Sequence, residues 1–303
     1  MSVTQARNDW VVVGVPTSAG AHHAGQDRAP AALRAAGLLD RLRGAGLEVA
    51  DDGDLPGAVF AVDHEHPTAR NLGAVARVAR EVAGAVTRLV QAGRRPLIVG
   101  GDCTITLGVI AGIRQVHDDA GLAYVDGDPD IGPVLPDTSG ILDATGIAHL
   151  LGHGERELAG LAGSRPLLDP ARLAMIGCDP REINADGRAF LAGQQVSFFE
   201  GAAGLSADPQ AAARGALSAL AGRSGPMVVH FDVDVVDSGD LPLGNFPHYG
   251  SGVTLDQVTA CLRVLLADPA CAALVLTEVN PAYDADGSQL DRYLTALATA
   301  LAG

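Results

Sequence analysis

The stretch "LAYVDGDPDIG", residues 122–132, contains the pattern that decides the fold. An apolar run ends at Val125, and three aspartates follow at alternate positions, Asp126, Asp128 and Asp130. A short apolar run of this kind is typical of a buried parallel strand, and side chains two residues apart on an extended chain share one face. The three carboxylates are therefore expected to converge. Because like charges repel at close range, their convergence predicts a bound divalent cation.

Short apolar runs alternate with Ala-, Leu- and Arg-rich helical stretches along the whole chain. We expect strands within 10–16, 95–102, 172–180, 226–237 and 271–281, and helices over 29–46, 69–93, 104–121 and 288–303. Residues 131–148 are predicted to form a long loop. Near-continuous apolar strands need cover on both faces, so the pattern predicts an α/β fold with three layers, α/β/α, around a mainly parallel sheet. Without an internal repeat or a linker, residues 1–303 are predicted to form one domain.

The composition excludes several classes of protein. The net charge is −15, and all 21 basic residues are arginine. A nucleic-acid partner is not expected because the chain has no dense basic stripe. The absence of lysine excludes a lysine Schiff base and a Walker lysine. No apolar run is long enough for a membrane span, and neither a signal peptide nor a CxxC pair is evident, so a cytoplasmic protein is expected. The acidity is interpreted as solubility, with a cationic substrate as the second interpretation.

Acidic residues also follow other predicted strands. Asp232 and Asp234 alternate within "HFDVDVVD" (230–237), and Glu278 follows an apolar run. In parallel α/β sheets, ligands bind outside the carboxyl ends of the strands. Two alternating clusters at this edge favour a site for two divalent metals. The alternative is that these are ordinary solvated or turn-forming aspartates.

Four motifs, in chain order, resemble those of the ureohydrolases, the family of arginase, agmatinase and formiminoglutamase. "GGDCT" (100–104) is similar to GGDHS, "DGDPD" (126–130) to DAHxD, "HFDVDVVD" (230–237) to SFDxDxxDP, and "TEVNP" (277–281) to a closing E-x-N-P. The resemblance covers most of the chain. It implies an arginase–deacetylase-like fold, a dinuclear Mn²⁺ site, and hydrolysis of a C–N bond in a guanidino or amidino compound with release of urea. It also implies a homo-oligomer, a trimer or a hexamer.

The resemblance assigns roles to individual residues. Asp126, Asp130, Asp232 and Asp234 fall on metal-ligand positions, and Asp126 and Asp232 fall on those that bridge both metals. Asp130 also falls on the catalytic position that hydrogen-bonds the attacking hydroxide. Glu278 falls on the residue that orients the guanidinium group.

The chain departs from the family at both histidine ligands, which are replaced by Cys103 and Asp128. Oxygen ligands suit Mn²⁺ or Mg²⁺, whereas a thiolate suits softer metals, so two, one or no metals are possible with this set. The alternative for Cys103 is a small buried residue beside the Gly-Gly turn. His230 stands where the family has serine, and Ser238 where it has proline.

The substrate-binding positions differ as well. Asp143 aligns with the proton-shuttling histidine of the family, and His149 and His153 lie nearby in sequence. We expect these two histidines on a helix surface rather than in a shuttle. Glu182 lies near the position that contacts a substrate amine. Because the Asn/Ser pattern that holds an α-carboxylate is absent, arginine itself is not the expected substrate.

Three functions remain open on the sequence. The first is a metallohydrolase acting on a cationic guanidino or amidino small molecule. The second is a metal-depleted ureohydrolase-fold protein with a binding role or different chemistry. The third is a phosphatase of the haloacid-dehalogenase type, because "MVVHFDVDVV" (227–236) contains a DxDxV motif after an apolar strand. That class usually needs a lysine, which this chain lacks.

Overall fold

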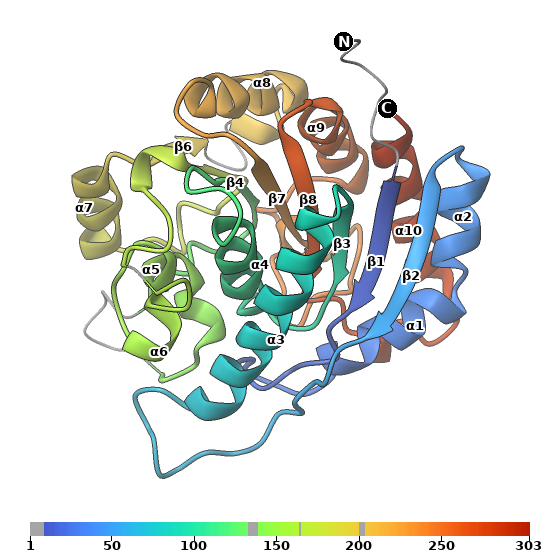
Figure 1. The fold of residues 1–303 in the computed structure, drawn as a ribbon. Helices are drawn as coiled ribbons and strands as arrows, with labels where there is room; N and C mark the ends of the chain where they lie inside the picture. Colours follow the sequence, from blue (N-terminus) through green and yellow to red (C-terminus); the bar gives the residue numbers. More distant parts are fainter. Residues whose placement is uncertain (1–8, 133–138, 164, 200–203) are drawn as a thin grey trace.

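The computed structural model describes residues 9–132, 139–163, 165–199 and 204–303. Eight parallel strands form one sheet with the order β2-β1-β3-β8-β7-β4-β5-β6 (Figure 1). The strands are β1 (Asp9–Gly14), β2 (Glu48–Asp54), β3 (Arg95–Val99), β4 (Gly121–Val125), β5 (Leu173–Ile176), β6 (Ser197–Phe199), β7 (Met227–Asp232) and β8 (Cys271–Thr277). Every strand expected from the sequence is present. β2 and β6 were not expected, because β2 is acidic and largely exposed and β6 has only three residues.

Helices cover both faces of the sheet, which confirms the three-layer α/β/α prediction. One face carries α1 (Ala29–Ala35), α2 (Leu38–Gly44), α8 (Pro209–Leu220), α9 (Leu255–Ala267) and α10 (Ser288–Ala302). The other carries α3 (Leu72–Gln91), α4 (Ile105–Arg114), α5 (Gly146–Leu150), α6 (Arg156–Ala159) and α7 (Ala185–Gln194). Figure 1 shows α3 and α4 in front of the sheet.

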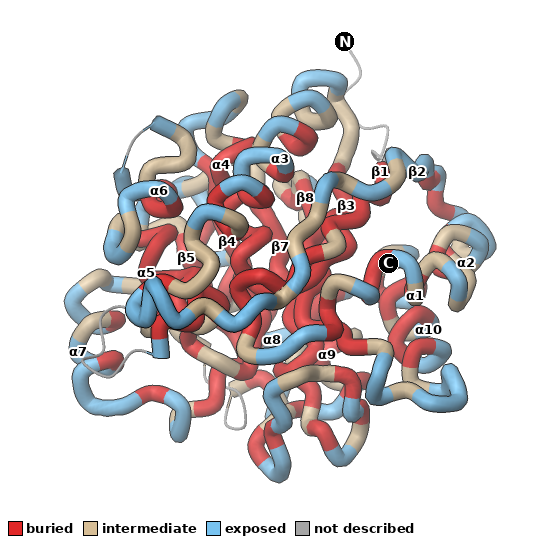
Figure 2. The backbone as a smooth tube through the Cα atoms, turned by 90° about the horizontal axis from the view of Figure 1, so that it is seen from below, coloured by how far each residue is buried: buried red, intermediate tan, exposed pale blue. Residues whose placement is uncertain are grey.

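The buried residues divide into two apolar clusters, one on each side of the sheet. Along β1, Trp10 and Val12 belong to one cluster, and Val11 and Val13 to the other. This alternation follows from the two-residue period of a strand. In Figure 2 the central strands are buried, and exposed residues lie on the helices around them. Within the part of the chain that the structure describes, no helix is both long and apolar enough to cross a membrane.

Two expectations about local structure were wrong. The helix expected over 29–46 is two helices, because Gly37 adopts a left-handed conformation with φ of 91° between them. The loop expected over 131–148 becomes helical from Asp143, where a 3-10 turn leads into α5. The apolar side chains of Ile147 and Leu150 are buried there, and this packing stabilises the helix. Residues 133–138 of the expected loop lie outside the described residues.

The strand order brings four sequence motifs to one place. Strands β3, β8, β7 and β4 are neighbours at the centre of the sheet, so their carboxyl ends lie side by side. The motifs with Cys103, Glu278, Asp232 and Asp126 follow or end these strands. After β3 the chain turns sharply at Gly101, where a Cβ atom would lie 1.8 Å from the carbonyl oxygen of Thr17. Only glycine permits this close approach of two backbone segments.

Candidate metal centre

A cavity of about 250 Å³ opens at the carboxyl edge of the central strands. All eight site residues predicted from the sequence line it: Cys103, Asp126, Asp128, Asp130, Glu182, Asp232, Asp234 and Glu278. Asp143 lines it as well. Among the described residues that line this cavity, none is basic apart from His22. The cavity is therefore strongly acidic, and its electrostatics favour a cation.

Asp126 and Asp232 are fixed by the same local structure. The amide of Asp128 donates a hydrogen bond of 2.7 Å to Oδ1 of Asp126, and the amide of Asp234 donates one of 2.8 Å to Oδ1 of Asp232. Each carboxylate thus uses one oxygen to hold the turn that follows its strand, a common use of aspartate. Oδ2 of both residues remains directed toward the cluster described next.

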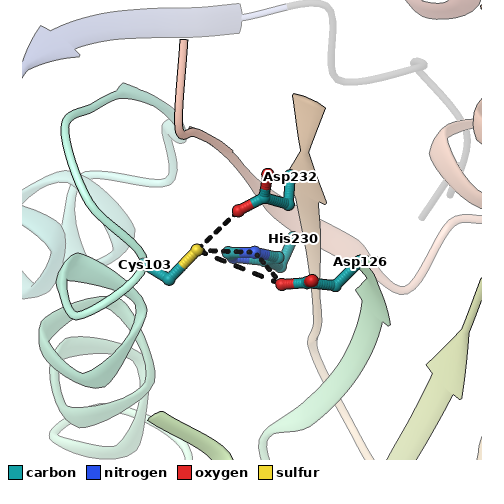
Figure 3. A group of neighbouring side chains, drawn as sticks. All are labelled: Cys103, Asp126, His230 and Asp232. Carbon is teal, nitrogen blue, oxygen red and sulfur yellow. Dashed lines mark hydrogen bonds and ion pairs between the residues drawn. The ribbon is translucent and has the colours of Figure 1, made fainter. Parts of the chain in front are cut away.

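Cys103 and His230 lie between these two carboxylates (Figure 3). One donor atom each from Cys103, Asp126, His230 and Asp232 lies within 4.8 Å of the other three, and all four residues are buried. We call this group the Cys103–His230 cluster. The Cys103 thiol donates to Oδ2 of Asp232 over 2.6 Å, and Nε2 of His230 is 3.5 Å from Oδ2 of Asp126. The cluster combines sulfur, nitrogen and oxygen donors, which are the ligand types of transition metals.

The His230 ring has a fixed orientation. Its Nδ1 is 2.7 Å from the Thr106 hydroxyl of α4, and its face stacks on the Tyr124 ring with 4.1 Å between the centroids. Nε2 consequently faces the cluster, where it lies 3.7 Å from Sγ of Cys103. The sequence identified His230 only as a replacement for serine. The structure places it among the candidate ligands.

Burial dominates the electrostatics of the centre. It raises the pKa of Asp126 to about 7, assisted by the Asp128 carboxylate, and that of Asp232 to about 6, assisted by Asp126. Burial and the Asp232 carboxylate raise the pKa of the Cys103 thiol, and burial lowers the pKa of His230 to about 4 although Asp232 opposes this. Because these pKa values are raised, protons compete with a divalent cation for the Asp126 and Asp232 carboxylates.

Asp130 and Glu278 have strained backbones. Their φ values are 46° and 61°, in the left-handed region that non-glycine residues rarely adopt. The Tyr124 hydroxyl donates to Oδ2 of Asp130 over 2.6 Å, and Nε2 of Gln26 donates to Oε2 of Glu278 over 2.8 Å. Strain of this kind is concentrated at functional sites.

One oxygen of Glu278 has no partner within the described structure. Glu278 is only 5 % exposed, and its buried Oε1 accepts no hydrogen bond from the described residues. A buried acceptor left unpaired is costly, and the cost is larger for a charged group. Since Glu278 lines the cavity, this oxygen indicates a ligand that carries hydrogen-bond donors or positive charge.

Asp128 has a neighbour that the sequence analysis missed. Nε2 of His248 lies 3.5 Å from Oδ2 of Asp128, and Glu182 joins them in a second group of possible metal donors. Burial lowers the pKa of His248, but Asp128 more than offsets this, so the pKa is raised overall. His248 lies in a loop after β7, and no spacing in the sequence connects this loop to Asp128.

Asp143, His149 and His153 occupy different environments. Asp143 is buried at the cavity, and its Oδ1 accepts a hydrogen bond of 2.7 Å from the Cys103 amide. His149 is also buried, contrary to the expectation of a helix surface, because Nε2 accepts from the Glu155 amide and Nδ1 contacts the Thr145 carbonyl. His153 is exposed, as expected, and neither histidine lines the cavity.

The fold and the candidate metal centre together define a class of protein. Its members are three-layer α/β proteins with an acidic site, suited to metal ions, at the carboxyl edge of a parallel sheet. The sequence model of the Arginase family matches residues 8–302. The chain belongs to the arginase family, whose arginases are metal-dependent hydrolases.

Individual relatives agree with this assignment. The chain is 28 % identical to arginase from Bacillus caldovelox over 275 residues, which cover 90 % of this chain and 91 % of the relative. The structure of that arginase superposes with a TM-score of 0.84 at 25 % identity, covering 97 % of this chain and 98 % of the other. Formiminoglutamase of Trypanosoma cruzi, solved with Mn²⁺, shares the fold with a TM-score of 0.75 at 19 % identity, covering 99 % and 95 %.

Proposed function

We propose that this protein is a metal-dependent hydrolase that cleaves a C–N bond of a guanidino or amidino small molecule and releases urea or a urea analogue. One observation carries the proposal: the unpaired, buried Oε1 of Glu278 at an acidic cavity of about 250 Å³. A guanidinium group offers several N–H donors and a positive charge, which match a carboxylate in two-point geometry.

The residues present fit a metal pair in the cavity. Asp126 and Asp232 would serve both metals, and Cys103, Asp128, Asp130 and Asp234 would complete the set. Mn²⁺ is the proposed metal where the donors are oxygen, because carboxylates suit it and because a structural relative was solved with it. When bound, the metals supply a Lewis acid and a more acidic water.

The protein's own residues bind and orient the substrate. Glu278 is held by Gln26, and its Oε1 pairs with the guanidinium or amidinium group of the substrate. Asp130, held by the Tyr124 hydroxyl, is the proposed acceptor of a proton from the attacking water. Asp143 stands where the family has its shuttle histidine, and we assign it no proton-transfer role.

The mouth of the cavity favours a second positive charge on the substrate. Glu182 and Asp128 line it, and the described lining contains no arginine to pair with a carboxylate. We therefore propose a substrate that carries an amine or no charge at its far end, rather than the α-carboxylate of arginine.

The metal-depleted alternative retains one specific observation. The Asp128 carboxylate lies 3.5 Å from Nε2 of His248, so it has a partner other than a metal. Against this alternative stands the Cys103–His230 cluster, in which four buried donor atoms converge. The phosphatase alternative receives no support from the family match.

The assembly and location remain proposals based on the family resemblance. We propose a homo-oligomer, a trimer or hexamer, in the cytoplasm. The four free and buried cysteines suit a reducing compartment. Light scattering coupled to size-exclusion chromatography measures the oligomeric state directly.

Urea release tests the function. The full-length protein, loaded with Mn²⁺, is incubated with guanidino amines, amidines and arginine, and the urea from guanidino compounds and the amide from amidines are quantified. We expect turnover of a guanidino amine at a rate at least about tenfold above that of arginine. Glu278→Gln should raise KM strongly, whereas Asp256→Asn, on the exposed surface of α9, should match the wild type. Absence of urea from every guanidino compound and of amide from every amidine would reject the proposal.

A further inference from the structure

We propose that the Cys103–His230 cluster is a zinc-type site, in which His230 supplies the imidazole ligand and the bound metal is Zn²⁺ in preference to Mn²⁺. The inference rests on the proposed function only in taking the cavity to be a metal site. The resemblance to ureohydrolases assigns no ligand role to position 230. The assignment comes from the geometry of this chain.

Three of the distances within the cluster lie within about 0.4 Å of those expected around one tetrahedral metal. Ligands bound to tetrahedral Zn²⁺ at its usual bond lengths lie roughly 3.3–3.6 Å from one another. The observed separations from Nε2 of His230 are 3.5 Å to Oδ2 of Asp126 and 3.7 Å to Sγ of Cys103, and Sγ is 4.0 Å from Oδ2 of Asp126. The thiol–Asp232 contact, at 2.6 Å, is shorter, because it is a hydrogen bond. Replacing its proton with a metal would lengthen it by about 1 Å.

The orientation of His230 matches that of a metal-ligating histidine. Such a residue commonly uses its second ring nitrogen as a donor to a neighbouring oxygen, which fixes the tautomer and aims the free nitrogen at the metal. In this structure Nδ1 contacts the Thr106 hydroxyl over 2.7 Å, and the Tyr124 ring supports the imidazole face. Nε2 then faces Cys103, Asp126 and the Thr277 hydroxyl.

An independent observation supports a cation at this place. Glu278, whose buried Oε1 has no partner among the described residues, forms a donor group with Cys103 and Asp143 directly beside the cluster. The region therefore contains more carboxylate oxygen than protein donors satisfy. A metal bound by Cys103 would bring positive charge next to this oxygen.

The donor chemistry determines which metal is preferred. Manganese favours carboxylate, carbonyl and water oxygens in octahedral geometry, whereas thiolate and imidazole donors in tetrahedral geometry favour zinc. The resemblance also assigns Asp130 as a metal ligand, but Asp130 does not belong to the Cys103–His230 cluster, and its Oδ2 accepts a hydrogen bond from Tyr124. Sulfur and nitrogen thus contribute half of the donors, and the site should discriminate against Mn²⁺.

Competition binding and cobalt spectroscopy test the proposal on the full-length protein. After removal of metals with a chelator, Zn²⁺ and a large excess of Mn²⁺ are added together, and the bound metals are quantified by mass spectrometry. We expect one zinc per chain, retained at least about tenfold in preference to manganese. With Co²⁺ as the probe, we expect a near-ultraviolet thiolate-to-metal charge-transfer band and the intense visible bands of a tetrahedral site.

Matched variants assign the ligands. Cys103→Ser should remove the charge-transfer band, whereas Cys261→Ser, at another buried thiol in α9, should retain it. His230→Gln should weaken zinc binding at least about tenfold, whereas His149→Gln, at another buried histidine that does not line the cavity, should leave the cobalt spectrum unchanged. If His230→Gln fails to fold by circular dichroism, zinc X-ray absorption of the wild type decides, because it distinguishes sulfur and imidazole ligands from oxygen alone.

The outcomes separate this inference from the proposed function. A cobalt protein without the band, a band that persists in Cys103→Ser, or an oxygen-only zinc shell would overturn the zinc-type site. Urea release by a manganese-loaded protein would in that case leave the proposed function intact. A zinc-type site in a protein that hydrolyses none of the guanidino or amidino compounds would support this inference and reject the hydrolase.

Discussion

At the scale of single residues, two histidines lie beside the two positions at which the motif resemblance expects histidine ligands. Cys103 and Asp128 stand where ureohydrolases have histidine ligands, and His230 and His248 lie 3.7 Å and 3.5 Å from them. Cys103 and Asp128 thus each have an imidazole nearby, which comes from β7 for Cys103 and from the loop after β7 for Asp128. The sequence alone does not indicate these contacts, because His230 and His248 lie more than a hundred positions after Cys103 and Asp128 in the chain.

We predict that Asp232→Asn lowers metal affinity at least about tenfold and abolishes turnover. Asp232 Oδ2 lies in the Cys103–His230 cluster, and the amide substitution removes its charge while preserving its shape. Titration with Mn²⁺ and Zn²⁺ followed by calorimetry measures the change, with Asp256→Asn as the matched control. Unaltered metal content in the Asp232 variant would contradict a centre built on this residue.

We also predict that Asp128→His strengthens binding of a second metal. The substitution restores an imidazole at a ligand position and removes one negative charge from an acidic cavity, where Asp128 contributes to the raised pKa of Asp126. Metal stoichiometry before and after incubation with Mn²⁺ provides the measurement. Weaker binding in this variant would mean that Asp128 is the partner of His248 and no metal ligand.

At the scale of elements, the turns after the strands position the chemistry. Asp126, directly after β4, and Asp232, at the end of β7, each accept a hydrogen bond from the amide two residues later. The turn after β3 brings Gly101 against Thr17, and the Gly101 carbonyl accepts a hydrogen bond from the Glu278 amide over 3.0 Å. Two segments that bear site residues are therefore tied to the same turn.

We predict that Gly101→Ala destabilises the fold by about 1–3 kcal/mol, because the new Cβ overlaps the Thr17 carbonyl oxygen. It should also weaken substrate binding, since Glu278 must shift with the turn. Gly73→Ala is the matched control: it lies in α3 with no atom within 4 Å of the new Cβ, so it should stabilise by roughly 0.5–1 kcal/mol. Urea denaturation measures both, and equal stability of the two variants would contradict the close-packed turn.

At the scale of the whole molecule, an acidic protein encloses its most acidic region. The net charge is −15, and most carboxylates of the cavity, though not Asp128 and Glu182, are buried at the centre of the sheet edge. Concentrated buried charge lowers stability unless protons or cations neutralise it. The fold therefore couples global stability to the occupancy of this centre.

We predict that the metal-stripped protein loses thermal stability as pH rises. The pKa values of Asp126 and Asp232 are raised to about 7 and about 6, from 3.8 in the unfolded chain. Between about pH 4 and pH 7 the folded state thus binds more protons than the unfolded state, so the free energy of unfolding falls as pH increases.

Differential scanning calorimetry from about pH 4.5 to about pH 8 should show a decrease in Tm of roughly 5 °C or more for the stripped protein. The metal-loaded protein should lack this decrease, because the metal has already displaced the protons. A stripped protein with a Tm that rises over the same range would contradict the raised pKa values.

Much of this architecture was predictable from the sequence. The spacing of apolar residues indicated the strands, the helices and thus the layers. Four motifs indicated which strand ends carry the candidate site. Both signals are local properties of the chain. That residues 1–303 form one folding unit stays a prediction. Local pattern failed at β2, which is acidic, and at Gly37, where a left-handed residue divides one expected helix into two.

The sequence by itself determined the residue types of the centre and their places at strand ends. Only the tertiary structure decided which donors meet: His230 with Cys103, His248 with Asp128, and an unpaired Glu278 oxygen at the cavity. The physical reason is that strand periodicity fixes the face on which a side chain lies, whereas contacts across the sheet depend on strand order. In this protein the order places β3, β8, β7 and β4 together, although they are far apart in the chain.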